Sequence, residues 1–211
     1  MPVPKIIVTI AEQNVKYISK FYEAGMDIAR FNLKYEVKRE HVNLCRVTEF
    51  DTPKGFGPDV MSKISYLGEP DYLAISFCEN VDDIEKAREK VHSRIIAKIE
   101  SREGIQKIYE LSKAADGIMI ARGDLLKNFR LELPRIEDGI QAIAALLGKE
   151  VWVATGLLPS GTSKDVTASE LYYIACRAKC ANAFLLSDEV IFEKNPVRVV
   201  RNLRNIIEMY A

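Results

Sequence analysis

Two neighbouring segments decide the fold of this chain: IIAKIESREGI, residues 95–105, and ADGIMIARGDLL, residues 115–126. Each contains a short apolar run, Ile95–Ile99 and Ile118–Ala121, with the length of a buried strand. Between these runs, residues 102–113 carry apolar side chains at helical spacing. The order strand, helix, strand predicts two parallel neighbours joined by a crossover helix.

Charged side chains follow both of these predicted strands. Side chains alternate along a strand, so Lys98 and Glu100 point to the same side. Asp124 comes just after the next strand. Because neighbouring strands lie about 4.8 Å apart, Glu100 and Asp124 could share one divalent cation, with the positive charge of Lys98 beside it. The pattern therefore predicts a metal site formed by Glu100 and Asp124.

The same alternation of strand and helix recurs along the whole chain. Every predicted strand is followed by a segment that can serve as its crossover, although residues 35–43 are polar and short. This favours a closed (β/α)8 TIM barrel over an open sheet, with residues 1–211 forming one domain. The predicted strands are Lys5–Ile10, Asp27–Leu33, Leu44–Phe50, Tyr72–Phe77, Ile95–Ile99, Ile118–Ala121, Val151–Ala154 and Ala183–Leu186. Further helices are predicted over residues 15–24, 81–91, 136–147, 168–180 and 196–209.

The composition argues against several classes of partner. Thirty basic side chains balance thirty acidic ones, so no overall field attracts nucleic acid or an anionic membrane. No apolar stretch approaches the roughly 20 residues of a membrane span, and the start of the chain lacks a signal-peptide core. The four cysteines have no CxxC spacing, which argues against a structural zinc site. We expect a cytoplasmic protein with no nucleic-acid or membrane partner.

Polar residues recur where the predicted strands end, which in a TIM barrel is the functional rim. Basic groups beside two carboxylates and several hydroxyls suit a small anion, such as a carboxylate or a phosphate, held by metal and guanidinium together. Structural roles are the alternative: the carboxylates could cap helices or form salt bridges, and the basic groups could brace the core or face solvent. The rim candidates are Arg30, Asn32, Lys34, Asp51, Thr52, Ser76, Lys98, Glu100, Asp124 and Thr155.

A series of motifs resembles the catalytic barrel domain of pyruvate kinases along essentially the whole chain. The segments AKIESREGI (97–105) and AADGIMIARGDL (114–125), which resemble the metal-binding segments of that family, are the most specific. The shared order of all the motifs carries the resemblance. The other motifs are PKIIVTI (4–10), EAGMDIARFNL (23–33), DTPKG (51–55), DYLAISF (71–77), VWVATGLL (151–158), VTASE (166–170) and LLSDEVIFEKNPVRVVRNL (185–203).

The resemblance implies a role for each matching residue at the metal. Glu100 and Asp124 would bind Mg²⁺ or Mn²⁺. Lys98 would stabilise the enolate and the phosphoryl group in transfer. Thr155 would help to protonate the enolate carbon.

It also implies how the substrate would be held. Arg30 would bind the phosphate of phosphoenolpyruvate. The backbone amides of Gly123 and Asp124, at the start of a helix, would receive the substrate carboxylate. Ser76 would line the same pocket, and ADP would accept the phosphate.

Departures from the family pattern affect the nucleotide and the phosphate. Full pyruvate kinases interrupt the third unit with a lid domain that closes over nucleotide, and no such insertion occurs near residues 53–58, so we expect ADP or ATP to bind weakly. No regulatory domain is expected after the barrel, because the sequence stops at Ala211. An extra Pro53 and the absence of an arginine in residues 56–59 put phosphate binding in question.

Other departures fall on the potassium site and on two loops. Asn32, Asp51 and Thr52 match the family's potassium ligands, whereas Lys34 stands where a serine is expected. A tethered ammonium could replace the ion, so we expect no requirement for potassium. Gly156 replaces a common glutamine, and Ser187, Asp188, Glu189 and Val190 replace a Ser-Gly-Glu-Thr run. Both of these changes are expected to reshape the pocket.

Three functions follow from these observations. The first is transfer of phosphate from phosphoenolpyruvate to ADP. The second is a metal-dependent lyase or decarboxylase that acts through a pyruvate enolate, of the oxaloacetate decarboxylase or aldolase type. The third is a non-catalytic pyruvate kinase paralogue that binds oxo acids or partner proteins. Barrels of the family associate through their helices, so a homo-oligomer is compatible with each.

Overall fold

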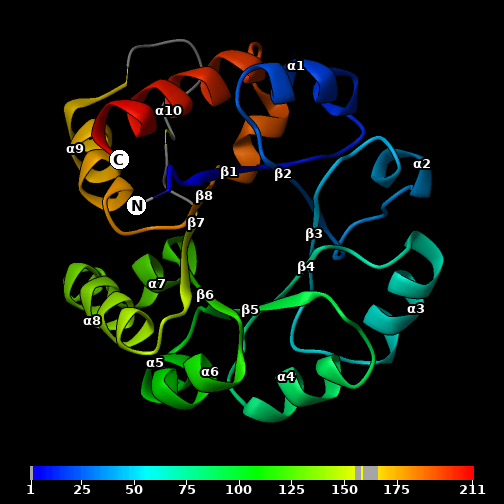
Figure 1. The fold of residues 1–211 in the computed structure, drawn as a ribbon, viewed down its shortest axis with the longest axis vertical. Helices are drawn as coiled ribbons and strands as arrows, with labels where there is room; N and C mark the ends of the chain where they lie inside the picture. The colour runs from blue at the N-terminus through cyan, green and yellow to red at the C-terminus, as the bar shows by residue number, and fades with distance from the viewer. Residues whose placement is uncertain (1, 155–157, 159–165) are drawn as a thin grey trace.

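The computed structural model describes residues 2–154, 158 and 166–211, and these form a closed barrel of parallel strands. Each strand pairs with its neighbours in sequence, and β1 pairs with β8 to close the barrel. Figure 1 looks down the barrel, with the helices arranged around it. The predicted TIM barrel is therefore confirmed. The strands are β1 Lys5–Thr9, β2 Ile28–Asn32, β3 Thr48–Asp51, β4 Tyr72–Ile75, β5 Arg94–Ile99, β6 Gly117–Ala121, β7 Glu150–Ala154 and β8 Ala183–Leu185.

Helices connect the strands and cover the outside of the barrel (Figure 1). Within the described residues, none of them is both long and apolar enough to cross a membrane. Residues 52–57 alone connect β3 to the helix that follows it. The helices are α1 Ile18–Glu23, α2 Arg39–Val42, α3 Pro58–Leu67, α4 Val81–Arg88, α5 Arg102–Gln106, α6 Ile108–Ala114, α7 Arg122–Asn128, α8 Leu133–Leu146, α9 Ala168–Ala178 and α10 Pro196–Tyr210, with 3-10 turns η1 Val15–Tyr17 and η2 Asp188–Phe192.

Two predicted strand boundaries were wrong by more than one residue. The third strand begins at Thr48 rather than Leu44, because Leu44 is 60% exposed in the turn that follows α2. The fourth strand ends at Ile75 rather than Phe77, since Phe77 takes a positive φ of 48° that leaves the extended conformation. The polar second unit contains only the four-residue helix α2. The helix predicted over residues 102–113 is divided into α5 and α6 at Lys107.

Alternating side chains divide the apolar core into two parts. One set packs between the strands and the helices, and includes Ile6 and Val8 of β1. The other set, which includes Ile7, Tyr72 and Trp152, fills the barrel interior. The Tyr72 and Trp152 rings lie 4.9 Å apart between centroids. Apolar packing thus closes the interior below the polar rim.

Four Asp or Asn side chains form a repeated contact at the opposite, amino-terminal end of the strands. Each precedes an even-numbered strand and accepts a hydrogen bond from the backbone N–H at or near the start of the odd-numbered strand before it. The donor–acceptor distances are 2.7 to 2.8 Å. We call these four contacts the strand clamps. The pairs are Asp27 with Ile6, Asp71 with Thr48, Asp116 with Ile95, and Asn182 with Val151.

Candidate active site at the carboxyl ends of the strands

A pocket of about 230 Å³ lies at the carboxyl ends of the strands. It brings together every rim residue that the sequence predicted and the structure describes, together with Gly123. Thr155, the predicted proton donor, lies outside the described residues, as does Gly156. The predicted residues in the lining are Arg30, Asn32, Lys34, Asp51, Thr52, Ser76, Lys98, Glu100, Gly123 and Asp124.

Lys98 is a buried ammonium at the centre of this site. Its Nζ donates to Asp51 Oδ1 at 2.7 Å and to Ser76 Oγ at 2.8 Å, and lies 3.4 Å from Glu100 Oε1. Burial alone would lower the pKa of Lys98, but the charges of Asp51 and Glu100 outweigh it and raise the pKa. Lys98 therefore stays charged in a water-poor setting, where its electrostatic influence is strong.

Asp51 is shared between two cations. Its Oδ1 accepts from Lys98 and, at 3.0 Å, from Ser76 Oγ, while its Oδ2 accepts from Arg30 Nη2. Burial acts to raise the pKa of Asp51, but Lys98 and Arg30 together hold it below its ordinary value. Asp51 is therefore ionised, with both of its oxygens bonded to protein donors.

Two other residues of the predicted potassium site also carry hydrogen bonds. Thr52 Oγ1 accepts from the Ser76 N–H at 2.9 Å, and Asn32 Oδ1 accepts from the Lys34 N–H at 2.9 Å. Lys34 is exposed beside them. The replacement of potassium by the Lys34 ammonium stays a prediction.

Arg30 is enclosed by acceptors on several sides. Its Nη1 donates to Thr9 Oγ1 at 2.8 Å and to Asp188 Oδ1 at 2.7 Å, and its Nη2 donates to Asp51. Thr9 Oγ1 donates in turn to Asp188 Oδ1 at 2.8 Å, which closes a ring of three groups. The Arg30 side chain is only 6% exposed, whereas that of Asp188 is 46% exposed. The Arg30 guanidinium that lines the pocket is thus already paired with protein acceptors.

Glu49 lies two residues before Asp51 on the same face of β3 and is fully buried. Neither of its carboxyl oxygens has a hydrogen-bond partner among the described residues, and the nearest ion-pair contact is Arg30 Nε, 3.9 Å from Oε1. Burial raises the pKa of Glu49 to about 8, against the opposing charge of Arg30. Glu49 is therefore mostly neutral at pH 7.

Glu100 is held by a strained backbone. Its Oε2 accepts from the N–H of Phe77 at 2.5 Å, and Phe77 has the positive φ that is rare for a bulky residue. Burial raises the pKa of Glu100, with the charges of Asp51 and Asp124 adding to it and Lys98 and the Phe77 N–H opposing it. Glu100 and Asp124 line the same pocket.

Asp124 lies in the first turn of α7, where its carboxylate pairs with Lys127 at 2.8 Å. Within the described part of the chain, no three His, Cys, Asp or Glu side chains gather into a metal-binding group. Two carboxylates are nevertheless a donor set that fits Mg²⁺, which takes hard oxygen ligands and completes its shell with water and substrate. The residues present therefore fit a magnesium or manganese ion.

Several residues at the site were not assigned to it from the sequence. Thr9 and Glu49 have the strand parity of interior residues, and the spacing of Glu49 from Asp51 was a usable signal. Asp188 appeared only as a departure in a loop motif. No sequence pattern indicates the positive φ of Phe77.

Comparisons with known proteins agree with the barrel and its motifs. The family model for the pyruvate kinase barrel domain matches residues 59–200. The pyruvate kinase of Aeropyrum pernix is 36% identical over 144 residues, which are 64% of this chain and 31% of that protein. The pyruvate kinase of Thermotoga maritima is 30% identical over 152 residues, which are 68% of this chain and 33% of that protein.

A third relative, the pyruvate kinase of Chlamydia trachomatis serovar D, is 34% identical over 149 residues, covering 66% of this chain and 31% of that protein. The matched region thus amounts to about a third of the length of these relatives. The family model covers more than half of the present chain. Fold, motif order and sequence identity agree, and the chain belongs to the pyruvate kinase family.

Proposed function

We propose that this barrel binds phosphoenolpyruvate or pyruvate with a divalent metal ion at the rim, and that it nominally transfers phosphate from phosphoenolpyruvate to ADP. The observation that carries the proposal is the buried Lys98 ammonium, held between Asp51, Ser76 and Glu100 beside a second carboxylate. A fixed positive charge in a shielded pocket stabilises the negative charge of an enolate. Family membership supports the same substrates.

In this proposal Glu100 and Asp124 hold Mg²⁺ or Mn²⁺. When bound, the metal ion would supply positive charge against the substrate carboxylate and the enolate oxygen. Phe77 keeps Glu100 in place through its backbone N–H. Potassium is not required, because Asp51 already has two protein cations and Lys34 stands nearby.

The other side chains of the rim take the roles that the family resemblance implies. Lys98 stabilises the enolate and the phosphoryl group in transfer. The amides of Gly123 and Asp124 receive the substrate carboxylate, with Ser76 beside them. Thr155 gives a proton to the enolate carbon. Arg30 binds the phosphate, a role for which it must exchange one of its present acceptors.

That requirement favours a second candidate, a lyase or decarboxylase that never binds phosphate. In the decarboxylation of oxaloacetate, the bond to the leaving carboxylate breaks and its electron pair forms the pyruvate enolate, which takes a proton at carbon. Lys98 would stabilise this enolate as before. The pairing of Arg30 with Asp188 is the specific observation for this candidate.

The test begins with the site. The protein is titrated with Mn²⁺ and then with oxalate, a mimic of the enolate, and binding is measured by calorimetry. We expect oxalate binding that requires the metal, is lost in Glu100→Ala and is retained in Glu103→Ala, which removes an exposed carboxylate from the neighbouring helix α5. ATP formation from phosphoenolpyruvate and ADP is then compared with release of carbon dioxide from oxaloacetate.

The two assays separate the candidates. ATP formation supports phosphoryl transfer, and carbon dioxide release without ATP formation supports the decarboxylase. Oxalate binding without either reaction leaves the non-catalytic paralogue. If the protein binds neither Mn²⁺ nor oxalate, the proposed function is overturned.

A further inference from the structure

Asp188 occupies the side of Arg30 that an incoming anion would need. Its Oδ1 accepts hydrogen bonds from both Arg30 Nη1 and Thr9 Oγ1, at 2.7 and 2.8 Å. On the other side of the guanidinium, Nη2 is bonded to the buried Asp51, and Nε faces the buried Glu49 at 3.9 Å. Asp188 is the most exposed of these partners, at 46%. An anion from solvent would therefore meet Arg30 where Asp188 lies.

The charge of the pocket also disfavours a bound phosphate. Among its described lining residues, the acidic side chains outnumber the basic ones by four to three. A phosphate carries more negative charge than a single carboxylate, so an additional fixed carboxylate at contact distance weakens the binding of phosphate more. The acidic lining residues are Asp51, Glu100, Asp124 and Asp188, and the basic ones are Arg30, Lys34 and Lys98.

We propose that Asp188 is a specificity-determining residue: its carboxylate takes the place of a substrate phosphate on Arg30, and the pocket thereby selects unphosphorylated oxo acids. This inference rests on the oxo-acid site of the proposed function, names its substrate class and favours its second candidate, the lyase or decarboxylase, over phosphoryl transfer. The hydrogen bonds of Asp188 to Arg30 and Thr9 lie on the β1 and β2 side of the rim. Lys98 lies in β5, Glu100 directly follows β5, and Asp124 lies in the first turn of α7 after β6, so an oxo-acid carboxylate bound there does not compete with Asp188.

The experiment measures two ligands in matched variants. Inorganic phosphate and, separately, oxalate with Mn²⁺ are titrated calorimetrically into the original protein, Asp188→Asn and Asp188→Ala. The control is Glu189→Gln, which removes the same charge from the adjacent, exposed position of η2. Asp188→Ala frees both donors and Asp188→Asn removes the competing negative charge, so we expect phosphate to bind about tenfold more tightly or better in both Asp188 variants. We expect oxalate binding to stay within about twofold of the original protein, since exposed charges at a distance are screened.

Each outcome decides one of the two proposals. Tighter phosphate binding in the Asp188 variants and not in Glu189→Gln supports the inference. Equal phosphate binding in all four proteins, or an equal gain in Glu189→Gln, overturns it, while metal-dependent oxalate binding would still stand for the proposed function. If none of the four proteins binds oxalate, the proposed function is overturned. The phosphate comparison then still decides what Asp188 does to Arg30.

Discussion

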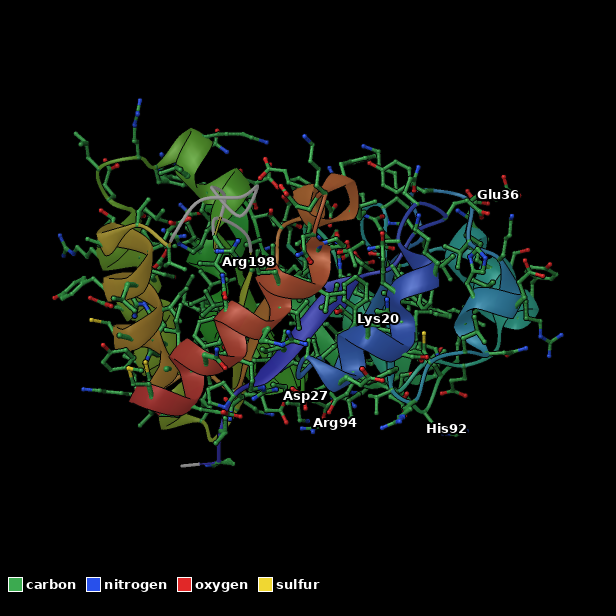
Figure 2. All side chains as sticks on the ribbon, turned by 90° about the horizontal axis from the view of Figure 1, so that it is seen from above. Lys20, Asp27, Glu36, His92, Arg94 and Arg198 are labelled. Carbon is green, nitrogen blue, oxygen red and sulfur yellow. The ribbon has the colours of Figure 1, made fainter. Side chains whose placement is uncertain are left out.

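The two ends of the barrel use charged and polar side chains in different ways. At the amino ends of the strands, the strand clamps repeat one simple contact four times, from a side-chain oxygen to a backbone N–H. At the carboxyl ends, Arg30 and Lys98 each pair with Asp51, and all three side chains are buried. In Figure 2, Asp27 and Arg94 lie along one edge of the molecule, and Glu36, which follows β2, lies toward the opposite edge.

The difference sets the end whose polar contacts serve stability apart from the end that carries the proposed site. Two ion pairs at the amino ends, Arg94 with Glu150 and Arg88 with Asp116, involve arginines more than 40% exposed, and such exposed pairs contribute little. The clamps there satisfy the strand backbone. The ion network at the rim has paid the desolvation cost of burial, and such networks are characteristic of functional sites. A larger cavity, of about 660 Å³, lies at the amino ends, where TIM barrels do not carry chemistry.

Removal of the central rim cation should have the largest effect. Lys98→Met leaves Asp51 and Glu100 buried without their shared ammonium, and we expect a loss of about 3 to 5 kcal/mol in the free energy of unfolding. Urea denaturation measures this loss, and Lys20→Met, at an exposed lysine of α1, is the control. A change of less than about 1 kcal/mol would contradict the view that the rim charges depend on one another.

The titration of Glu49 should destabilise the folded protein at high pH. Its pKa rises from an ordinary 4.5 to about 8 in the folded protein, so between these values the folded state holds a proton that the unfolded chain has released. The free energy of unfolding should therefore fall as the pH rises from 4.5 to 8.

Glu49→Gln removes this titration and keeps the shape of the side chain. We expect it to stabilise the protein by on the order of 2 kcal/mol at pH 8, and by little at pH 5. Denaturant unfolding at both pH values tests the prediction. An effect of Glu49→Gln that is the same at both pH values would show that Glu49 does not titrate in this range.

At the opposite end, breaking one strand clamp should cost less. Asp116→Ala leaves the backbone N–H of Ile95 without its acceptor, which we expect to lower the free energy of unfolding by about 1 to 3 kcal/mol. Arg88→Ala removes the exposed ion pair to the same carboxylate, together with the exposed hydrogen bonds from Arg88 to the Ala114 carbonyl, and should cost less than about 1 kcal/mol. Metal-dependent oxalate binding should be unchanged in Asp116→Ala; its loss would mean that the two ends are coupled.

The smallest expected effect is that of potassium. If Lys34 supplies the positive charge, replacing potassium by tetramethylammonium at constant ionic strength should leave Mn²⁺-dependent oxalate binding within about twofold. Calorimetry in the two salts measures this. A strong requirement for potassium would instead assign a cation-binding role to Asn32 and Thr52.

The sequence was informative where local pattern and function coincide. Apolar runs of strand length identified the barrel, and the rule that chemistry follows the strands identified the lining of the pocket, from Arg30 to Asp124. The apolar pattern placed the start of the third strand wrongly at Leu44, which lies in an exposed turn. The sequence did not predict the conformation of Phe77, because a positive φ is a property of the local backbone that no residue type there indicates.

By itself, the sequence determined the strand order, the parallel barrel and the set of polar residues at its rim, because each depends on hydrophobic periodicity over a short stretch of chain. Only the tertiary structure decided which charges pair. Arg30 and Asp188 are separated by 158 residues, and the contact of Thr9 with Asp188 spans 179. Those partners meet because β1 and β8 close the barrel, and the isolation of Glu49 depends equally on what surrounds it in the closed interior. Local sequence carries no record of either, since the electrostatic energy of a buried group depends on neighbours supplied by distant strands.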